Sequence, residues 1–168
     1  MTITAISYTS VEAGISATRS SWTSHAYYGM SFTPLFPVMI SSFCFQLNRT
    51  SAATGDLRID LWSAIASTGL PNAILDSSFN SAYISGLPAS QTLAYQSFAL
   101  TTGVQLTGNT KYVATAICSN SDANNYIFAG NATNSSYDYG GSVYTVGSAS
   151  DFSGNSNYDY FFEIWAAT

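Results

Sequence analysis

The chain has very few charged side chains for its length. It holds nine acidic and four basic residues in 168, a charged fraction of 8%, whereas soluble domains usually carry about 25%. The polar surface must therefore be built mainly from Ser, Thr, Asn, Gln and Tyr. Such a surface favours dense packing against other proteins or against sugars, and it leaves little material for acid–base chemistry.

The basic residues are scarce and unclustered: Arg19, Arg49, Arg58 and Lys111. Nucleic-acid binding needs a basic footprint that displaces counterions, and attraction to anionic lipid needs a polybasic patch. We therefore predict neither a nucleic-acid nor a membrane partner. No apolar run approaches the length of a spanning helix, and the first residues lack the basic start and apolar core of a signal peptide. The initiating Met1 favours synthesis and assembly in a cytosol.

Motifs for nucleophilic or cofactor chemistry are also missing. His25 is the single histidine, so a Ser-His-Asp triad would depend on it, and it lies in a Ser/Thr-rich segment typical of plain polar surface. No phosphate-binding glycine loop is present. Cys44 and Cys118 have no zinc-ligand spacing, and both an inter-strand disulfide and two buried free thiols fit the sequence.

The acidic residues leave two further hypotheses open. Asp138, Asp159 and Glu163 lie in the aromatic C-terminal third, where a pair of carboxylates could cleave a glycosidic bond. Residues 119–125 and 151–155 are rich in oxygen ligands but do not match the EF-hand loop. We therefore predict no enzyme activity and no cofactor, and a structural calcium ion stays an unsupported alternative.

Apolar and polar residues alternate with a period of two over much of the chain, which predicts strands that each place one face on a core. No segment shows sustained helical periodicity, and a longer loop is expected between Gly69 and Pro88. Short strands separated by turns favour an all-β fold, an antiparallel β-sandwich of the jelly-roll type. The strands are predicted over residues 43–47, 57–62, 95–100, 111–118, 125–130, 142–146 and 160–165.

Two irregular segments flank this pattern and are the expected contact regions. Residues 1–26 are Ser/Thr-rich and predict an N-terminal arm before a single domain over 27–168, and residues 131–157 are rich in Asn, Ser, Gly and Tyr. Tyrosine joins a flat apolar face to a hydroxyl, which suits protein interfaces and sugar rings. The candidate interface residues are Tyr8, Trp22, His25, Tyr137, Tyr139 and Tyr144.

Several segments follow one another in a recognisable order along the chain. They are Tyr28–Pro34, Ile40–Leu47, Thr54–Leu61, Gly69–Pro71, Leu106–Tyr112, Asn125–Phe128 and Tyr160–Trp165. In this order they resemble the choice-of-anchor type of jelly-roll domain, which is similar to carbohydrate-binding modules and recurs in secreted bacterial proteins and phage structural proteins. The resemblance covers roughly residues 27–166 and implies a binding or surface module without catalytic residues.

Because this domain fills nearly the whole chain, the resemblance predicts a protein that acts by assembling. The main hypothesis is a non-enzymatic virion protein, a phage capsid decoration (cement) protein or a head or tail fibre component. Its expected location is the virion surface, its partners are capsid or tail proteins, and a homo-oligomer such as a trimer is expected. The alternative is a carbohydrate-binding or adhesion module of a secreted or tail-fibre protein.

Overall fold

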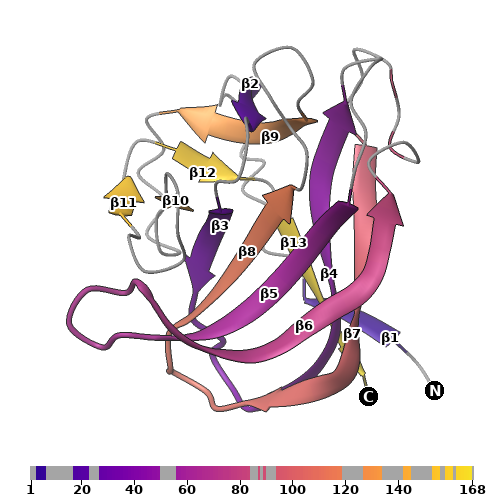
Figure 1. Cartoon of the computed structure of the whole chain (residues 1–168). Coiled ribbons are helices and arrows are strands. Elements are labelled where there is room, and N and C mark those ends of the chain that lie inside the picture. The colour runs from indigo at the N-terminus through magenta and orange to yellow at the C-terminus, as the bar shows by residue number, and fades with distance from the viewer. Residues whose placement is uncertain are drawn as a thin grey trace.

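The computed structural model shows an all-β chain whose strands form two antiparallel sheets (Figure 1). It describes residues 3–6, 17–22, 27–49, 56–83, 87, 89, 94–118, 127–133, 142–144, 153–155, 158–160 and 162–167. These ranges contain no helix, and so none that is long and apolar enough to cross a membrane. The all-β, antiparallel prediction is therefore confirmed.

One sheet has seven strands and is organised around a single long strand, β4 (Val38–Arg49). On one side β4 pairs with β7 (Ala94–Leu106), and on the other with β13 (Phe162–Ala167), which in turn pairs with β1 (Ile3–Ile6). The last residues of β4 pair with β9 (Ile127–Thr133). Two short strands, β2 (Ala17–Trp22) and β12 (Tyr158–Tyr160), then pair with β9.

The other sheet has six strands in the order β11-β10-β3-β8-β5-β6. Its four principal strands are β3 (Tyr27–Phe32), β8 (Tyr112–Cys118), β5 (Asp56–Ala64) and β6 (Pro71–Tyr83). The short strands β10 (Ser142–Tyr144) and β11 (Ser153–Asn155) extend the sheet beyond β3.

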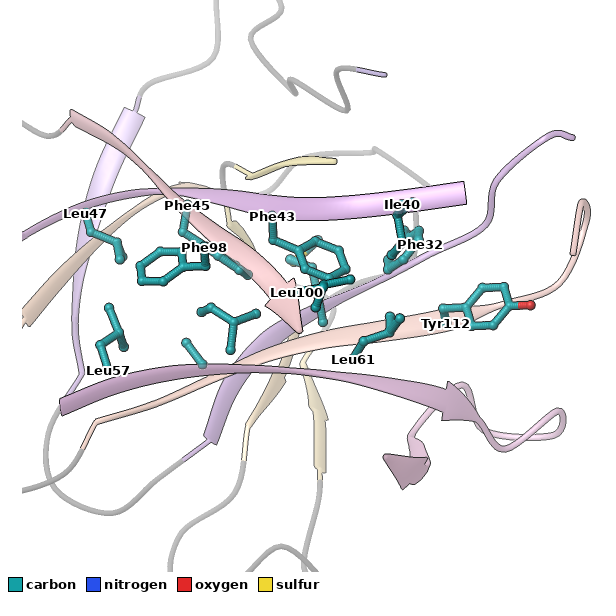
Figure 2. Close-up of a cluster of buried hydrophobic side chains, with 14 of the residues drawn as sticks. Phe32, Ile40, Phe43, Phe45, Leu47, Leu57, Leu61, Phe98, Leu100 and Tyr112 are labelled. Carbon is teal, nitrogen blue, oxygen red and sulfur yellow. The ribbon is translucent and has the colours of Figure 1, made fainter. Parts of the chain in front are cut away.

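The core lies between the two sheets and is supplied by alternate residues of their strands (Figure 2). Phe43, Phe45 and Leu47 of β4 face it from one sheet, and Leu57 and Leu61 of β5 from the other, all with no exposed surface. The rings of Phe32 and Phe43 meet edge to face across the layers, with centroids 6.1 Å apart. Each such side chain contributes about 1.5–3 kcal/mol by leaving water, so the period-two pattern is what holds the sheets together.

The free edges of the two sheets lie against each other along β6 and β7, which pack side by side (Figure 1). The carboxylate of Asp76 joins them. One of its oxygens accepts hydrogen bonds from the backbone N–H and the hydroxyl of Thr102, both at 3.3 Å, and the other accepts from the N–H of Ser77 at 2.8 Å. A charged residue at an edge also discourages pairing with another chain.

The structure corrects the expected middle loop. Residues 71–83 form the long strand β6. The sequence did not predict this strand because its pairing with β5 shifts register three times, which breaks the alternation of apolar and polar residues. Its first residue is also Pro71. Proline normally argues against a strand, although it is tolerated at the start of an edge strand. Each of the other predicted strands overlaps an observed one, although the bounds differ and the terminal segment is divided between β12 and β13. Residues 125–126, 145–146 and 161 of these predictions lie outside the described residues.

Strands also occur within residues 1–26. β1 pairs with β13 and β2 pairs with β9, so parts of this segment belong to the seven-stranded sheet. The role of residues 1–26 as a contact arm stays a prediction.

Candidate functional site

The predicted interface residues are only partly described. Tyr8, His25, Tyr137 and Tyr139 lie outside the described residues. The backbone of Trp22 ends β2, where it pairs with Ile127 in the seven-stranded sheet. The backbone of Tyr144 lies in β10 of the six-stranded sheet and pairs with Tyr28. The structure thus places these two positions in different sheets and does not assemble the six residues into one site.

A different surface stands out in the described part of the chain. Leu35 and Phe36 are adjacent and are 69% and 64% exposed, the highest values among the large apolar side chains described. Met39 and Ile65 are each 40% exposed at the same end of the sheets. We call Leu35, Phe36, Met39 and Ile65 the apolar end. Exposed apolar side chains that are neighbours mark a contact site more often than scattered ones do, and Leu35 and Phe36 are adjacent in one turn.

Three turns that lie side by side form this end of the molecule (Figure 1). Residues 33–37 connect β3 to β4, residues 65–70 connect β5 to β6, and residues 107–111 connect β7 to β8. The register places all three together, because Tyr112 pairs with both Phe32 and Ser63, and Leu106 pairs with Val38.

The turn that carries Leu35 and Phe36 packs against the turn at residues 107–111. Pro34 and Pro37 bracket the pair and restrict its backbone, and the carbonyl oxygen of Pro34 accepts a hydrogen bond from the N–H of Asn109 at 2.7 Å. Gly108 lies so close beneath that a Cβ there would be 2.8 Å from the Cα of Phe36. The two apolar side chains are therefore presented by an ordered backbone, and little entropy is lost when they bind.

The neighbouring turn at 65–70 is closed by its own backbone. The N–H of Ile65 donates to the carbonyl of Leu70 at 2.8 Å, and the N–H of Gly69 donates to the carbonyl of Ile65 at 2.7 Å. The side chain of Lys111 lies across Gly69, with its Cδ 3.1 Å from where a Cβ would stand. Lys111 is exposed, and it is the one charged residue in the three turns.

A polar cluster on β5 is centred on the buried carboxylate of Asp60, while its partner Arg58 is partly exposed. Asp60 is fully buried, and its Oδ2 accepts from Arg58 Nη2 at 2.8 Å and from Arg58 Nε at 3.1 Å, while its Oδ1 accepts from the hydroxyl of Ser77 at 2.5 Å. Nearby, the indole N–H of Trp62 donates to the hydroxyl of buried Thr115 at 2.8 Å. These contacts satisfy the carboxylate and the indole, so the group stabilises the sheet.

The carboxylates considered for glycoside cleavage are described incompletely. Asp138 lies outside the described residues, and the backbones of Asp159 and Glu163 lie in β12 and β13, where they pair with Ala132 and Cys44. Among the residues that the structure describes, no group of three or more His, Cys, Asp or Glu could hold a metal ion. Of the oxygen-rich segments, only residues 153–155 are described, as β11.

The two cysteines belong to different sheets. Cys44 lies on β4, where its reduced side chain is buried at 4% exposed, and the backbone of Cys118 ends β8. Of the two alternatives that the sequence left open, the structure shows Cys44 buried and outside any disulfide. A buried thiol behaves as a small apolar side chain.

Comparison with known proteins gives no family for this chain. No protein-family model matches it, and a search of the curated proteins found no similar sequence.

The sequence prediction missed the apolar end, although a signal for it was present. An adjacent Leu and Phe between two prolines cannot continue a central strand, because proline cannot donate to the ladder. A turn follows from that, and a turn carries its side chains at the surface. The Pro-Leu-Phe-Pro sequence at residues 34–37 therefore indicates an exposed apolar pair.

Proposed function

We propose that the two packed sheets form a jelly roll, and the support is the nesting of the strand pairs. β5 pairs with β6, β4 with β7, β3 with β8, and β1 with β13. In sequence, each pair lies between the two strands of the next pair: β5 and β6 lie between β4 and β7, which lie between β3 and β8, which lie between β1 and β13. Successive pairs belong alternately to the two sheets. A long two-stranded ribbon rolled into two layers produces this nesting. Jelly rolls recur in viral capsid proteins and lectins, in keeping with the choice-of-anchor resemblance.

We infer that the protein is a non-enzymatic structural component of the virion surface, a phage capsid decoration (cement) protein or a head or tail fibre component. A fold alone does not define a function. The observation that carries this proposal is the ordered, exposed pair Leu35 and Phe36 at one end of the sheets. Rigid apolar anchors on a surface with few charges are suited to protein–protein assembly.

The carbohydrate-binding alternative requires exposed aromatic rings on which sugars can stack. Of the aromatic side chains that the structure describes, Phe36 is exposed, whereas Trp62 and Tyr112 are 6% and 7% exposed and the remaining ones are fully buried. Phe36 stands beside Leu35, and no second exposed aromatic ring lies beside it among the side chains that the structure describes. Within this part of the chain, a protein contact is therefore favoured over a sugar platform.

A binding experiment with particles from the source of this chain tests the proposal. Purified protein is added to particles from which it has been stripped, and the bound fraction is measured by sedimentation. We expect saturable binding at a fixed ratio to the major shell or fibre protein. Leu35→Ser/Phe36→Ser should need about tenfold more protein to saturate, whereas Ile74→Ser, which removes an apolar side chain that is 48% exposed on β6, should bind normally. No binding by the wild-type chain would contradict the proposal.

A further inference from the structure

One side chain of the apolar end, that of Met39, carries a sulfur atom that can be oxidised. Met39 is 40% exposed, whereas Met30 is 2% exposed and belongs to the core cluster. The remaining methionine, Met1, lies outside the described residues. Oxidation of a methionine thioether to the sulfoxide turns a flexible apolar side chain into a polar one. The two described methionines therefore differ in the access that an oxidant has to their sulfur atoms.

The geometry of the strands explains the exposure of Met39. Its neighbours on β4, Val38 and Ile40, pack on the core, so the alternation of the strand turns Met39 to the outer face of the sheet. On β7, Gly103 has a φ of 76°, a conformation that favours glycine. A Cβ at Gly103 would lie 3.6 Å from the Sδ of Met39. The glycine that this backbone requires therefore leaves space beside the sulfur atom.

The position of Met39 links its oxidation to the contact surface. Met39 follows Phe36 by three residues, and it pairs with Gln105, two residues before the turn at 107–111. A sulfoxide at Met39 places a polar oxygen at the rim of the apolar end. When this surface docks on an apolar partner surface, that oxygen loses its water, and burial of a polar group without a hydrogen bond costs free energy. Oxidation should therefore weaken docking.

We propose that Met39 is an oxidation site that regulates the docking of the apolar end. In the reaction with a peroxide, a lone pair of the sulfur attacks one oxygen, an S–O bond forms and the O–O bond breaks. The displaced hydroxide takes the proton of the transferred oxygen and leaves as water, so the sulfur loses two electrons and the peroxide gains them. The thioether form docks tightly and the sulfoxide form docks weakly. This inference rests on the proposed function and deepens it by naming a modification of the same surface.

Peptide mapping by mass spectrometry tests the oxidation site and needs no particle. The full-length protein is treated with hydrogen peroxide, and the gain of one oxygen atom is followed at each methionine. Met39 should be oxidised about tenfold or more faster than Met30, because the sulfur of Met30 reacts only when the sandwich opens. Protein oxidised at Met39 should keep the melting temperature of the untreated protein, because this side chain is exposed. Equal rates at Met39 and Met30 would overturn the proposal.

Binding to stripped particles tests the regulation. Wild-type protein oxidised at Met39 should need about fivefold more protein to half-saturate the particles than untreated protein does, and Met39→Gln, whose polar amide stands in for the sulfoxide, should show a similar loss. The matched control is Met39→Leu, which keeps an apolar side chain but has no sulfur, and it should bind to the same extent before and after peroxide. A loss of binding after peroxide that persists in Met39→Leu would assign the effect to another residue and overturn the proposal.

The two measurements separate this inference from the proposed function. If untreated and oxidised wild-type protein bind particles equally well, the regulation by Met39 is overturned and the virion role stands. If the untreated protein does not bind particles, the virion role is contradicted and the regulation falls with it. The faster oxidation of Met39 than of Met30 would then remain as a property of the isolated protein, because peptide mapping measures it without particles.

Discussion

At the scale of single residues, the chain uses its few charges to stabilise sheets. Asp60 has no exposed surface, and its carboxylate is neutralised by Arg58, whose side chain is 39% exposed. Ser77 donates a third hydrogen bond from the neighbouring strand β6. A buried carboxylate is tolerable when it is paired and hydrogen-bonded in this way.

Removal of Arg58 should therefore destabilise the protein strongly. Arg58→Ala leaves a buried negative charge without its cation, and we expect it to lower the free energy of unfolding by about 3 kcal/mol. Arg58→Ala/Asp60→Asn removes the charge as well and should lose less, about 1–2 kcal/mol. Urea unfolding at neutral pH measures both. A single variant that is more stable than the double variant would contradict the account of this pair.

The buried thiol of Cys44 gives a second prediction. In a Cys118→Ser background, Cys44 should react with a thiol-specific reagent roughly a hundredfold more slowly in the folded protein than in urea, because burial keeps the thiol from the reagent. The absorbance change of a chromogenic thiol reagent gives the reaction rate. Equal rates in the folded protein and in urea would show that the Cys44 thiol is exposed. If the unfolded, unreduced wild-type protein had no reactive thiol, Cys44 and Cys118 would be paired in a disulfide.

At the scale of elements, the long strands β4, β5, β7 and β8 follow directly from the sequence. The apolar residues of β4, β5 and β7 alternate because one face of each strand meets the core. β8 is instead a continuous apolar run, and its residues 112–116 are all buried. The strand β6 does not follow, because its bulged pairing with β5 breaks the alternation. The two prolines around Leu35 and Phe36 indicate an exposed turn, but the sequence does not show which other turns lie beside it, because that depends on the strand register.

The edge formed by β6 and β7 is the element most open to a direct test. Asp76→Ala removes the oxygens that receive Thr102 and Ser77, and we expect a loss of about 1–2 kcal/mol in unfolding free energy. With the charge gone from the edge, aggregation on heating should also become faster. Thr102→Ala, which keeps the charge and the two backbone donors, is the control and should show a smaller loss without faster aggregation. Unfolding curves and light scattering measure these effects.

At the scale of the whole molecule, one end of the sheets stands out. It presents the exposed side chains of Leu35 and Phe36 together with Lys111. The low overall charge predicted a protein that assembles, but the sequence pointed to the tyrosine-rich segment rather than to residues 33–37. Composition reports what a surface contains and not where its parts lie, which depends on the strand register.

The measurement that tests the central proposal most directly is the number of copies of this chain in purified particles from its source, counted by quantitative mass spectrometry. We expect a fixed, reproducible number: hundreds of copies for a capsid decoration protein, or a handful for a fibre component. A chain that is absent from particles and present in the surrounding medium would contradict the virion role and leave a secreted binding module.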